Sequence, residues 1–168
     1  RAAPAVNEAV RALADHGVHG YFGDESGYKS ALVNWLDKRH GWSADPDWMT
    51  QVHGVVSALG LFIQAYSEPG DGVVVFAPVY HMFAHMVHAN GRRLIESPLR
   101  QVQGRYEMDL DGLKGLIDRG TKIVLLCSPH NPGGRVWSAA ELTALADFCL
   151  ENDLILISDE IHQDLVFE

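Results

Sequence analysis

Two short, uninterrupted apolar segments separated by one helical segment constrain this chain more than any other feature. Residues 122–127 and 154–157 are rich in aliphatic side chains and do not alternate between apolar and polar positions. Strands that are apolar on both sides are typical of a parallel sheet covered on both faces. Parallel neighbours need a crossover between them, so the pattern predicts a β-α-β unit.

The helix between these segments has a well-defined start. Ser138 and Glu141 have the spacing of a capping box, and Trp137 and Leu142 are placed for a hydrophobic staple. The alternation continues toward the N-terminus, with strands predicted over residues 73–77 and 93–96 and helices over residues 81–90 and 109–119, the last ended by Gly120. We therefore expect an α/β fold with three layers, α/β/α, around a mostly parallel sheet.

The first part of the chain is predicted to be helical. Pro4 suits the first turn of a helix over residues 5–13. Ser26 can cap a second helix, which Gly41 can end in a left-handed conformation. Farther along, residues 99–106 are polar and are expected to form a surface excursion.

Bulk properties argue against several classes of protein. A chain of 168 residues, 47% of them hydrophobic, suits one domain with a sizeable core. Its net charge is −9 and its 13 basic residues are scattered, which disfavours nucleic acid as a partner. The apolar runs are too short to span a bilayer, so no membrane association is expected. Cys127 and Cys149 have no Cys-x-x-Cys spacing and are interpreted as core residues of a cytoplasmic protein.

Chemically informative side chains follow three predicted strands, where ligands gather in open α/β sheets. Asn131 lies in a loop with two prolines and two glycines, and Asp159 follows a buried strand, so its carboxylate needs a partner such as a cationic ring nitrogen. Tyr80 offers a ring on which a flat heteroaromatic ligand can stack. Gly54 opens a helix over residues 55–63, whose free N–H groups favour a phosphate.

Each of these residues also has an ordinary structural explanation. Asp159 can cap a turn, Asn131 can be a turn residue, Tyr80 can be a packing residue and Gly54 can simply begin a helix. Their combined order favours the functional interpretation. A metal site is not favoured, because neither cysteine nor a clear carboxylate completes the set of histidines at helical spacing, His81, His85 and His88.

These residues resemble a known family, the fold-type-I pyridoxal-phosphate (PLP) enzymes of the aminotransferase superfamily (class I/II). Within it, the chain is most similar to the MalY/PatB-type carbon-sulfur lyases related to cystathionine β-lyase. The most specific stretches are residues 128–137, with His-Asn-Pro, and residues 158–165, with Asp-Glu-Ile-His. Weaker support comes from residues 20–23, 39–42, 54–56, 78–80 and 90–93.

The resemblance implies a role for each matching residue. Asp159 would pair with the protonated pyridine nitrogen of PLP and is the residue assigned to catalysis. Asn131 would hydrogen-bond the phenolic oxygen, near which His162 replaces a tyrosine of many relatives. Tyr80 would stack on the ring.

The resemblance also implies a phosphate site and an assembly. The amides of Gly54, Val55 and Val56 would hold the cofactor phosphate. Tyr21 matches a position that reaches the phosphate of the neighbouring subunit, so a homodimer is implied, with a small amino acid as substrate.

The Schiff-base lysine of the family has no counterpart among the lysines of this chain, Lys29, Lys38, Lys114 and Lys122. Residues 1–168 are therefore expected to be the first part of a PLP-binding large domain. The lysine and a smaller C-terminal domain would lie beyond Glu168, and the chain alone is predicted to be inactive.

The expected reaction of the complete protein is α,β-elimination on cystathionine or a cysteine-type thioether, giving a thiol, pyruvate and ammonia. One alternative is a PLP-dependent aminotransferase, which shares every residue named above. Another is a non-catalytic fragment or regulatory binding module. An NAD-binding domain is disfavoured, because no Gly-x-Gly-x-x-Gly follows a predicted strand.

Overall fold

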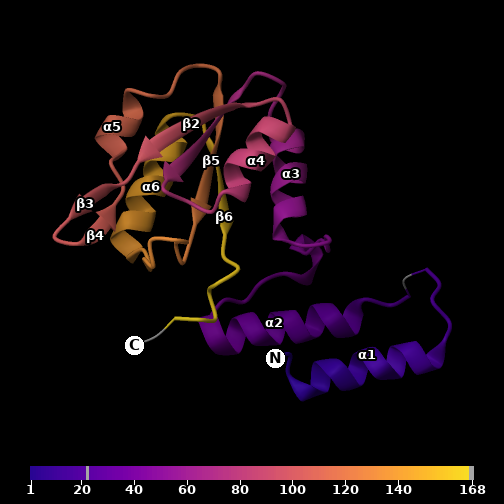
Figure 1. The fold of residues 1–168 in the computed structure, drawn as a ribbon. Helices are drawn as coiled ribbons and strands as arrows, with labels where there is room; N and C mark the ends of the chain where they lie inside the picture. Colours follow the sequence, from indigo (N-terminus) through magenta and orange to yellow (C-terminus); the bar gives the residue numbers. More distant parts are fainter. Residues whose placement is uncertain (22, 167–168) are drawn as a thin grey trace. The chain divides into compact units, whose positions relative to one another are not determined.

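The computed structural model describes residues 1–21 and 23–166 (Figure 1). The chain divides into two compact units, Arg1–Gln51 and Val52–Glu168. The first unit contains α1 (Pro4–His16), α2 (Ser26–His40) and the short 3-10 helix η1 (Pro46–Trp48). Both predicted helices are confirmed, and α1 is longer than expected at each end. Phe22, within one of the stretches that carry the resemblance, lies outside the described residues.

The two ends of α2 differ in how well they were predicted. Gly41 has a φ of 63° and its N–H donates to the carbonyl of Asp37, as expected of a left-handed C-cap. The prediction that Ser26 caps the start is wrong, because Ser26 is the first residue of the helix. The carboxylate of Asp24 instead accepts hydrogen bonds from the N–H of Ser26 at 2.8 Å and from its hydroxyl at 2.7 Å.

A four-stranded parallel sheet forms the centre of the second unit. Its strands are β1 (Gly72–Ala77), β2 (Arg93–Pro98), β5 (Thr121–Cys127) and β6 (Ile155–Asp159). They lie in the order β2-β1-β5-β6, and every neighbouring pair is parallel. The expected parallel sheet is confirmed.

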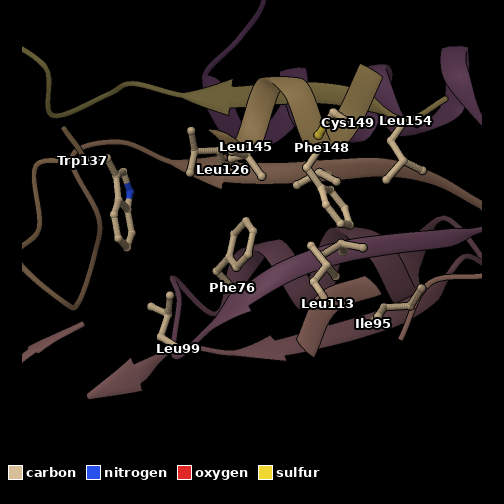
Figure 2. Packing of buried hydrophobic residues seen from close by; sticks show 12 residues of the cluster. Phe76, Ile95, Leu99, Leu113, Leu126, Trp137, Leu145, Phe148, Cys149 and Leu154 are labelled. Carbon is tan, nitrogen blue, oxygen red and sulfur yellow. The ribbon is translucent and has the colours of Figure 1, made fainter. Parts of the chain in front are cut away.

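Helices cover both faces of this sheet. Val73 and Val75 pack with α3 (Val55–Tyr66) and α4 (Met82–Ala89) in one buried cluster. Val74 and Phe76, with the opposite orientation, pack with α5 (Leu110–Lys114) and α6 (Ala139–Glu151) in the other, which Figure 2 shows. The three-layer α/β/α architecture is therefore confirmed. Within the described residues, no helix has the length and apolar character needed to cross a bilayer.

The start of α6 follows the prediction closely. The hydroxyl of Ser138 accepts from the N–H of Glu141 at 3.3 Å, and the Glu141 carboxylate accepts from the N–H of Ser138 at 2.8 Å. Trp137 is buried, and Leu142 packs against the same cluster. The capping box is confirmed, and both staple residues belong to one apolar cluster.

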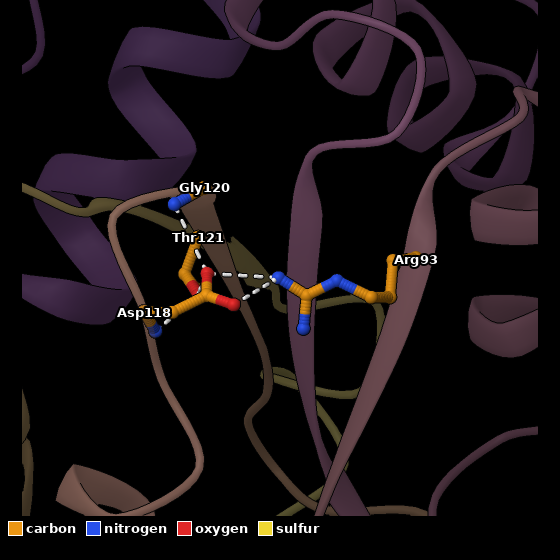
Figure 3. A network of polar contacts seen from close by, with 4 residues as sticks. All are labelled: Arg93, Asp118, Gly120 and Thr121. Atoms are coloured by element: carbon orange, nitrogen blue, oxygen red, sulfur yellow. Dashed lines mark hydrogen bonds and ion pairs between the residues drawn. The ribbon is translucent and has the colours of Figure 1, made fainter.

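The segment before β5 departs from the prediction. Helix α5 ends at Lys114 with Gly115 as its C-cap, so Gly120 does not end it. The intervening turn is held by Asp118, whose carboxylate accepts from the N–H of Gly120, the hydroxyl of Thr121 and the guanidinium of Arg93 (Figure 3). These side-chain bonds favour a turn over a continued helix. The network lies where β2 and β5 begin.

Residues 99–106 form more regular structure than a surface excursion. β3 (Arg100–Val102) and β4 (Arg105–Glu107) pair antiparallel across a two-residue loop. Gln103 and Gly104 both have positive φ, of 49° and 80°, as a type I′ hairpin turn requires.

Candidate active site

A cavity of about 360 Å³ lies at the carboxyl ends of the sheet strands. The strands β1 and β5 are neighbours in the sheet. The chain leaves β1 toward β2 on one side and leaves β5 toward β6 on the other, so β1 and β5 flank a topological switch point. The volume lies in the range of small-molecule sites. The described residues that line it are Val55, Val56, Tyr80, Cys127, Asn131, Asp159, Ile161 and His162, which belong to the second unit.

The start of α3 forms one wall of the cavity. Gly54 is the N-cap residue with a φ of 89°, a conformation that favours glycine. Ala58 donates to the Gly54 carbonyl, and no side-chain cap bonds the N–H groups ahead of it. Val55 and Val56 line the cavity, whereas Gly54 shapes the turn without lining it. This helix start combines unbonded donors with a positive dipole end, which suits an anion.

Asp159 is the one acidic side chain among the described residues that line the cavity. It ends β6 opposite Cys127 of β5 and is 7% exposed. One carboxylate oxygen accepts from the N–H of Ile161 at 3.1 Å. Among the described residues, no arginine, lysine or histidine forms an ion pair with it. A buried carboxylate without a cation has the electrostatics of a binding site for a cationic group.

Asn131 is held in a tightly bonded loop after β5. Its N–H contacts the sulfur of Cys127 at 3.4 Å. The N–H of His130 donates to the Arg135 carbonyl at 2.7 Å, and the N–H of Gly134 donates to the His130 carbonyl at 2.8 Å. These bonds close the loop on itself, so Asn131 has a fixed backbone beside the cavity.

The far end of this loop is anchored by charge and by an aromatic ring. The guanidinium of Arg135 pairs with Glu141 and lies 4.8 Å from the centre of the Trp137 ring. Desolvation acts to raise the pKa of Glu141, but hydrogen bonds from Ser138 and Arg135 and the charge of Arg135 bring it below its ordinary value. The indole N–H of Trp137 donates to the Cys127 carbonyl at 2.9 Å. The loop is thereby tied to both β5 and α6.

Tyr80 follows β1 on the other side of the switch point. It is half-buried and packs against the cluster beneath α3 and α4. Its ring meets the ring of His81 edge to face, with centroids 4.8 Å apart. Part of the Tyr80 side chain remains available to the cavity.

Cys127 and Ile161 also line the cavity, although neither was a candidate from the sequence. Cys127 is buried, as predicted, but as the last residue of β5 it also reaches the ligand side of the sheet. Burial, together with the negative charge of Asp159, raises the pKa of the Cys127 thiol, and the N–H of Asn131 offsets part of that rise. A raised pKa disfavours the thiolate, which is the nucleophilic form of cysteine. The sequence signal that could have identified Cys127 as a cavity residue is its position at the end of a predicted strand.

The remaining candidates are not among the described residues that line this cavity. Tyr21 belongs to the first unit and is fully exposed, so its implied role toward a neighbouring subunit stays a prediction. His81, His85 and His88 are exposed, and the described part of the chain contains no group of residues arranged to hold a metal. Burial raises the pKa of the Cys149 thiol to about 11, and neither cysteine forms a disulfide.

A family model described as aminotransferase class I and II matches residues 1–168. Cystathionine beta-lyase PatB of Bacillus subtilis is 44% identical over 167 residues, which are 99% of this chain and 43% of PatB. Arginine–pyruvate transaminase AruH of Pseudomonas aeruginosa is 32% identical over 170 residues, 99% of this chain and 42% of AruH.

Solved structures extend the likeness to the fold. The crystal structure of cystalysin from Treponema denticola, described as containing pyridoxal 5′-phosphate, superposes with a TM-score of 0.93 at 38% identity. The match covers 100% of this chain and 43% of cystalysin. The chain thus spans less than half the length of the proteins it resembles.

Proposed function

The chain belongs to the aminotransferase class I and II family, and from that premise we propose that the complete protein is a PLP-dependent carbon-sulfur β-lyase. It would convert cystathionine or another cysteine-type thioether and water to a thiol, pyruvate and ammonia. The likeness to PatB supports the lyase over other activities of the family. The resemblance that the sequence motifs indicated is confirmed at the level of the family.

Asp159 is the observation that carries the proposal. It is a buried carboxylate in a cavity, and no cation from the described residues pairs with it. A protonated pyridine nitrogen would supply the missing charge, and Asp159 would hold the proton on that nitrogen. When bound, the cofactor supplies an electron-withdrawing ring that stabilises negative charge on the α-carbon of the substrate.

The remaining cavity residues fit other parts of the same cofactor. Tyr80 would stack on one face of the ring, and Asn131 would donate a hydrogen bond to the phenolic oxygen, near which we place His162. The N–H groups at Val55 and Val56 would bind the phosphate at the positive end of α3. Gly54 would let the phosphate approach the backbone closely, since the space beside its α-carbon is open.

We further propose that residues 1–168 are the first part of the PLP-binding large domain. The chain matches only 43% of the length of PatB, which supports a cofactor lysine and a smaller domain in the remainder of the protein. Tyr21 would reach the phosphate of a neighbouring subunit in a homodimer. The protein would act in the cytoplasm on a small amino-acid substrate.

An aminotransferase is the second candidate, supported by the likeness to AruH. The cavity residues would hold the cofactor in the same way for either reaction. The difference lies in the fate of the amino group. A lyase releases it as ammonia, whereas an aminotransferase passes it to a keto acid.

The test uses the complete protein with added PLP. A visible absorbance band, and trapping of the cofactor by borohydride on a lysine beyond residue 168, are expected. Pyruvate formed from cystathionine without a keto-acid acceptor would support the lyase, and turnover only with an acceptor would support the aminotransferase. No absorbance band would remove the PLP proposal and favour a non-catalytic binding module.

A further inference from the structure

His130 precedes Asn131 but does not line the cavity. Its side chain is 3% exposed, and its Nε2 lies 2.8 Å from the carbonyl oxygen of Pro78. Pro78 belongs to the loop after β1 that leads to Tyr80. The contact therefore connects two loops, 52 residues apart in the chain, that carry cavity residues on opposite sides of the switch point.

The chemistry of this contact fixes the tautomer of the ring. A carbonyl oxygen only accepts hydrogen bonds, so Nε2 must carry the proton and donate it. The other nitrogen, Nδ1, is buried and has no hydrogen-bond partner among the residues that the structure describes. Burying an unpaired acceptor is unfavourable, and an apolar ring would avoid that cost. Packing alone is thus a poor reason for a histidine at this position, whereas the bond to Pro78 is a sufficient one.

Neighbouring groups leave the ring little freedom to turn away. It meets the ring of Trp137 edge to face, with centroids 5.5 Å apart. A Cβ at Gly133 would lie 2.8 Å from Cδ2 of His130 and 3.0 Å from the ring of Tyr106, so this backbone approaches both rings closely. The His130 ring is therefore packed on several sides, so a shift of one loop would displace the ring and, through its hydrogen bond, the other loop.

We propose that His130 is a positioning residue that locks the Tyr80 loop to the Asn131 loop and so sets the width of the cavity for a flat ligand. The inference rests on the proposed function, because it assumes that Tyr80 and Asn131 contact PLP. His130 acts through these two residues and does not itself touch the cofactor.

Two substitutions in the complete protein separate the hydrogen bond from the packing. His130→Phe keeps a ring against Trp137 and removes the donor, whereas His130→Gln loses the ring but places an amide N–H near the position of Nε2. His130→Phe is expected to weaken PLP binding roughly fivefold to tenfold, as for the loss of one neutral hydrogen bond. His130→Gln is expected to stay within about twofold of wild type. Phe148→Leu, in the cluster beneath α6, is the packing control: it should lower the melting temperature and leave PLP binding unchanged.

Two further readouts test the coupling itself. Hydrogen exchange in the PLP-free protein is expected to quicken over residues 79–86 in His130→Phe and not in the Gln variant or the control. Asn131→Ala combined with His130→Phe should weaken PLP binding by less than the product of the single effects, because both changes disturb one unit.

The outcomes distinguish this inference from the proposed function. If the wild-type protein shows no PLP band, the proposed function fails, while the exchange measurement still decides whether the loops are coupled. If wild type binds PLP and His130→Phe matches it in both affinity and exchange, the coupling is wrong. Should His130→Phe not fold, His130→Leu replaces it as the donor-free variant. Failure of both to fold, or equal losses for Phe and Gln, would overturn the positioning role.

Discussion

Replacing Asp159 by asparagine should separate cofactor binding from folding. Asparagine is close in shape, and its amide oxygen can still accept the hydrogen bond from the N–H of Ile161. No ion pair from the described residues is lost, because none reaches Asp159. We therefore expect the free energy of unfolding of the PLP-free protein to change by less than about 1 kcal/mol, as for a substitution that breaks no buried network.

Binding of PLP should respond far more strongly. Breaking a buried ion pair costs about 3–5 kcal/mol, or roughly two to four orders of magnitude in affinity. In Asp159→Asn the pyridine nitrogen can release its proton, so no unpaired cation has to remain buried. We therefore expect the loss of PLP affinity to lie near the lower end of this range, at about 100-fold. Turnover should fall at least as far, since the neutral ring withdraws electrons less well.

The assay compares PLP titrations followed by absorbance with thermal unfolding of the PLP-free protein. Asp118→Asn is the matched control, because Asp118 bonds Arg93, Gly120 and Thr121 at the opposite ends of the strands. It should lower the melting temperature and leave PLP affinity unchanged. Asp159→Asn binding PLP within about threefold of wild type would refute the proposed charge pair, and a large loss of stability without a loss of binding would make Asp159 a structural residue.

Three further changes test other parts of the site. Val55→Pro removes one N–H at the first position of α3, where proline is tolerated. It should weaken PLP binding roughly tenfold or more. The affinity for pyridoxal, which lacks the phosphate, should stay unchanged. Gly133→Ala must displace the rings of Tyr106 or His130, and should lower both the melting temperature and PLP affinity. The pKa of Glu141 is below its ordinary value of 4.5 in the folded protein, so its contribution to stability is present above that pH and is lost as the pH falls. Glu141→Gln should therefore flatten the decline of the melting temperature below about pH 4.5.

Local chemistry explains which elements the sequence predicted well. The apolar runs of β5 and β6, the capping box at Ser138 and Glu141, and the left-handed Gly41 depend on neighbouring residues alone. The end of α5 was missed because Asp118 bonds both Thr121 and Arg93, and Arg93 is distant from it in the chain. The hairpin at residues 100–107 was missed because Gln103 is an unusual residue for a positive φ.

The candidate site follows a similar division. Parallel strands bring their carboxyl ends to one edge of the sheet, so the sequence alone was enough to predict that Tyr80, Asn131 and Asp159 lie in one group. The structure places all three in the lining of one cavity, while their roles toward PLP stay predictions. Cys127 and Ile161 were not predicted to line the cavity. The direction in which a side chain points from a strand end or a turn depends on the path of the backbone, which amino-acid composition does not determine.

Contacts that hold the site together are harder to predict than the residues that form it. The hydrogen bond between His130 and Pro78 joins two loops that no local pattern relates. Both proposed reactions use the cofactor that these two loops would bind. Substitutions in the loops should therefore lower cofactor affinity to the same extent whether the protein is a lyase or an aminotransferase. The choice between elimination and amino transfer then belongs to groups that touch the substrate side chain. Cofactor affinity therefore tests residues 1–168 directly, whereas release of pyruvate from cystathionine tests the complete protein.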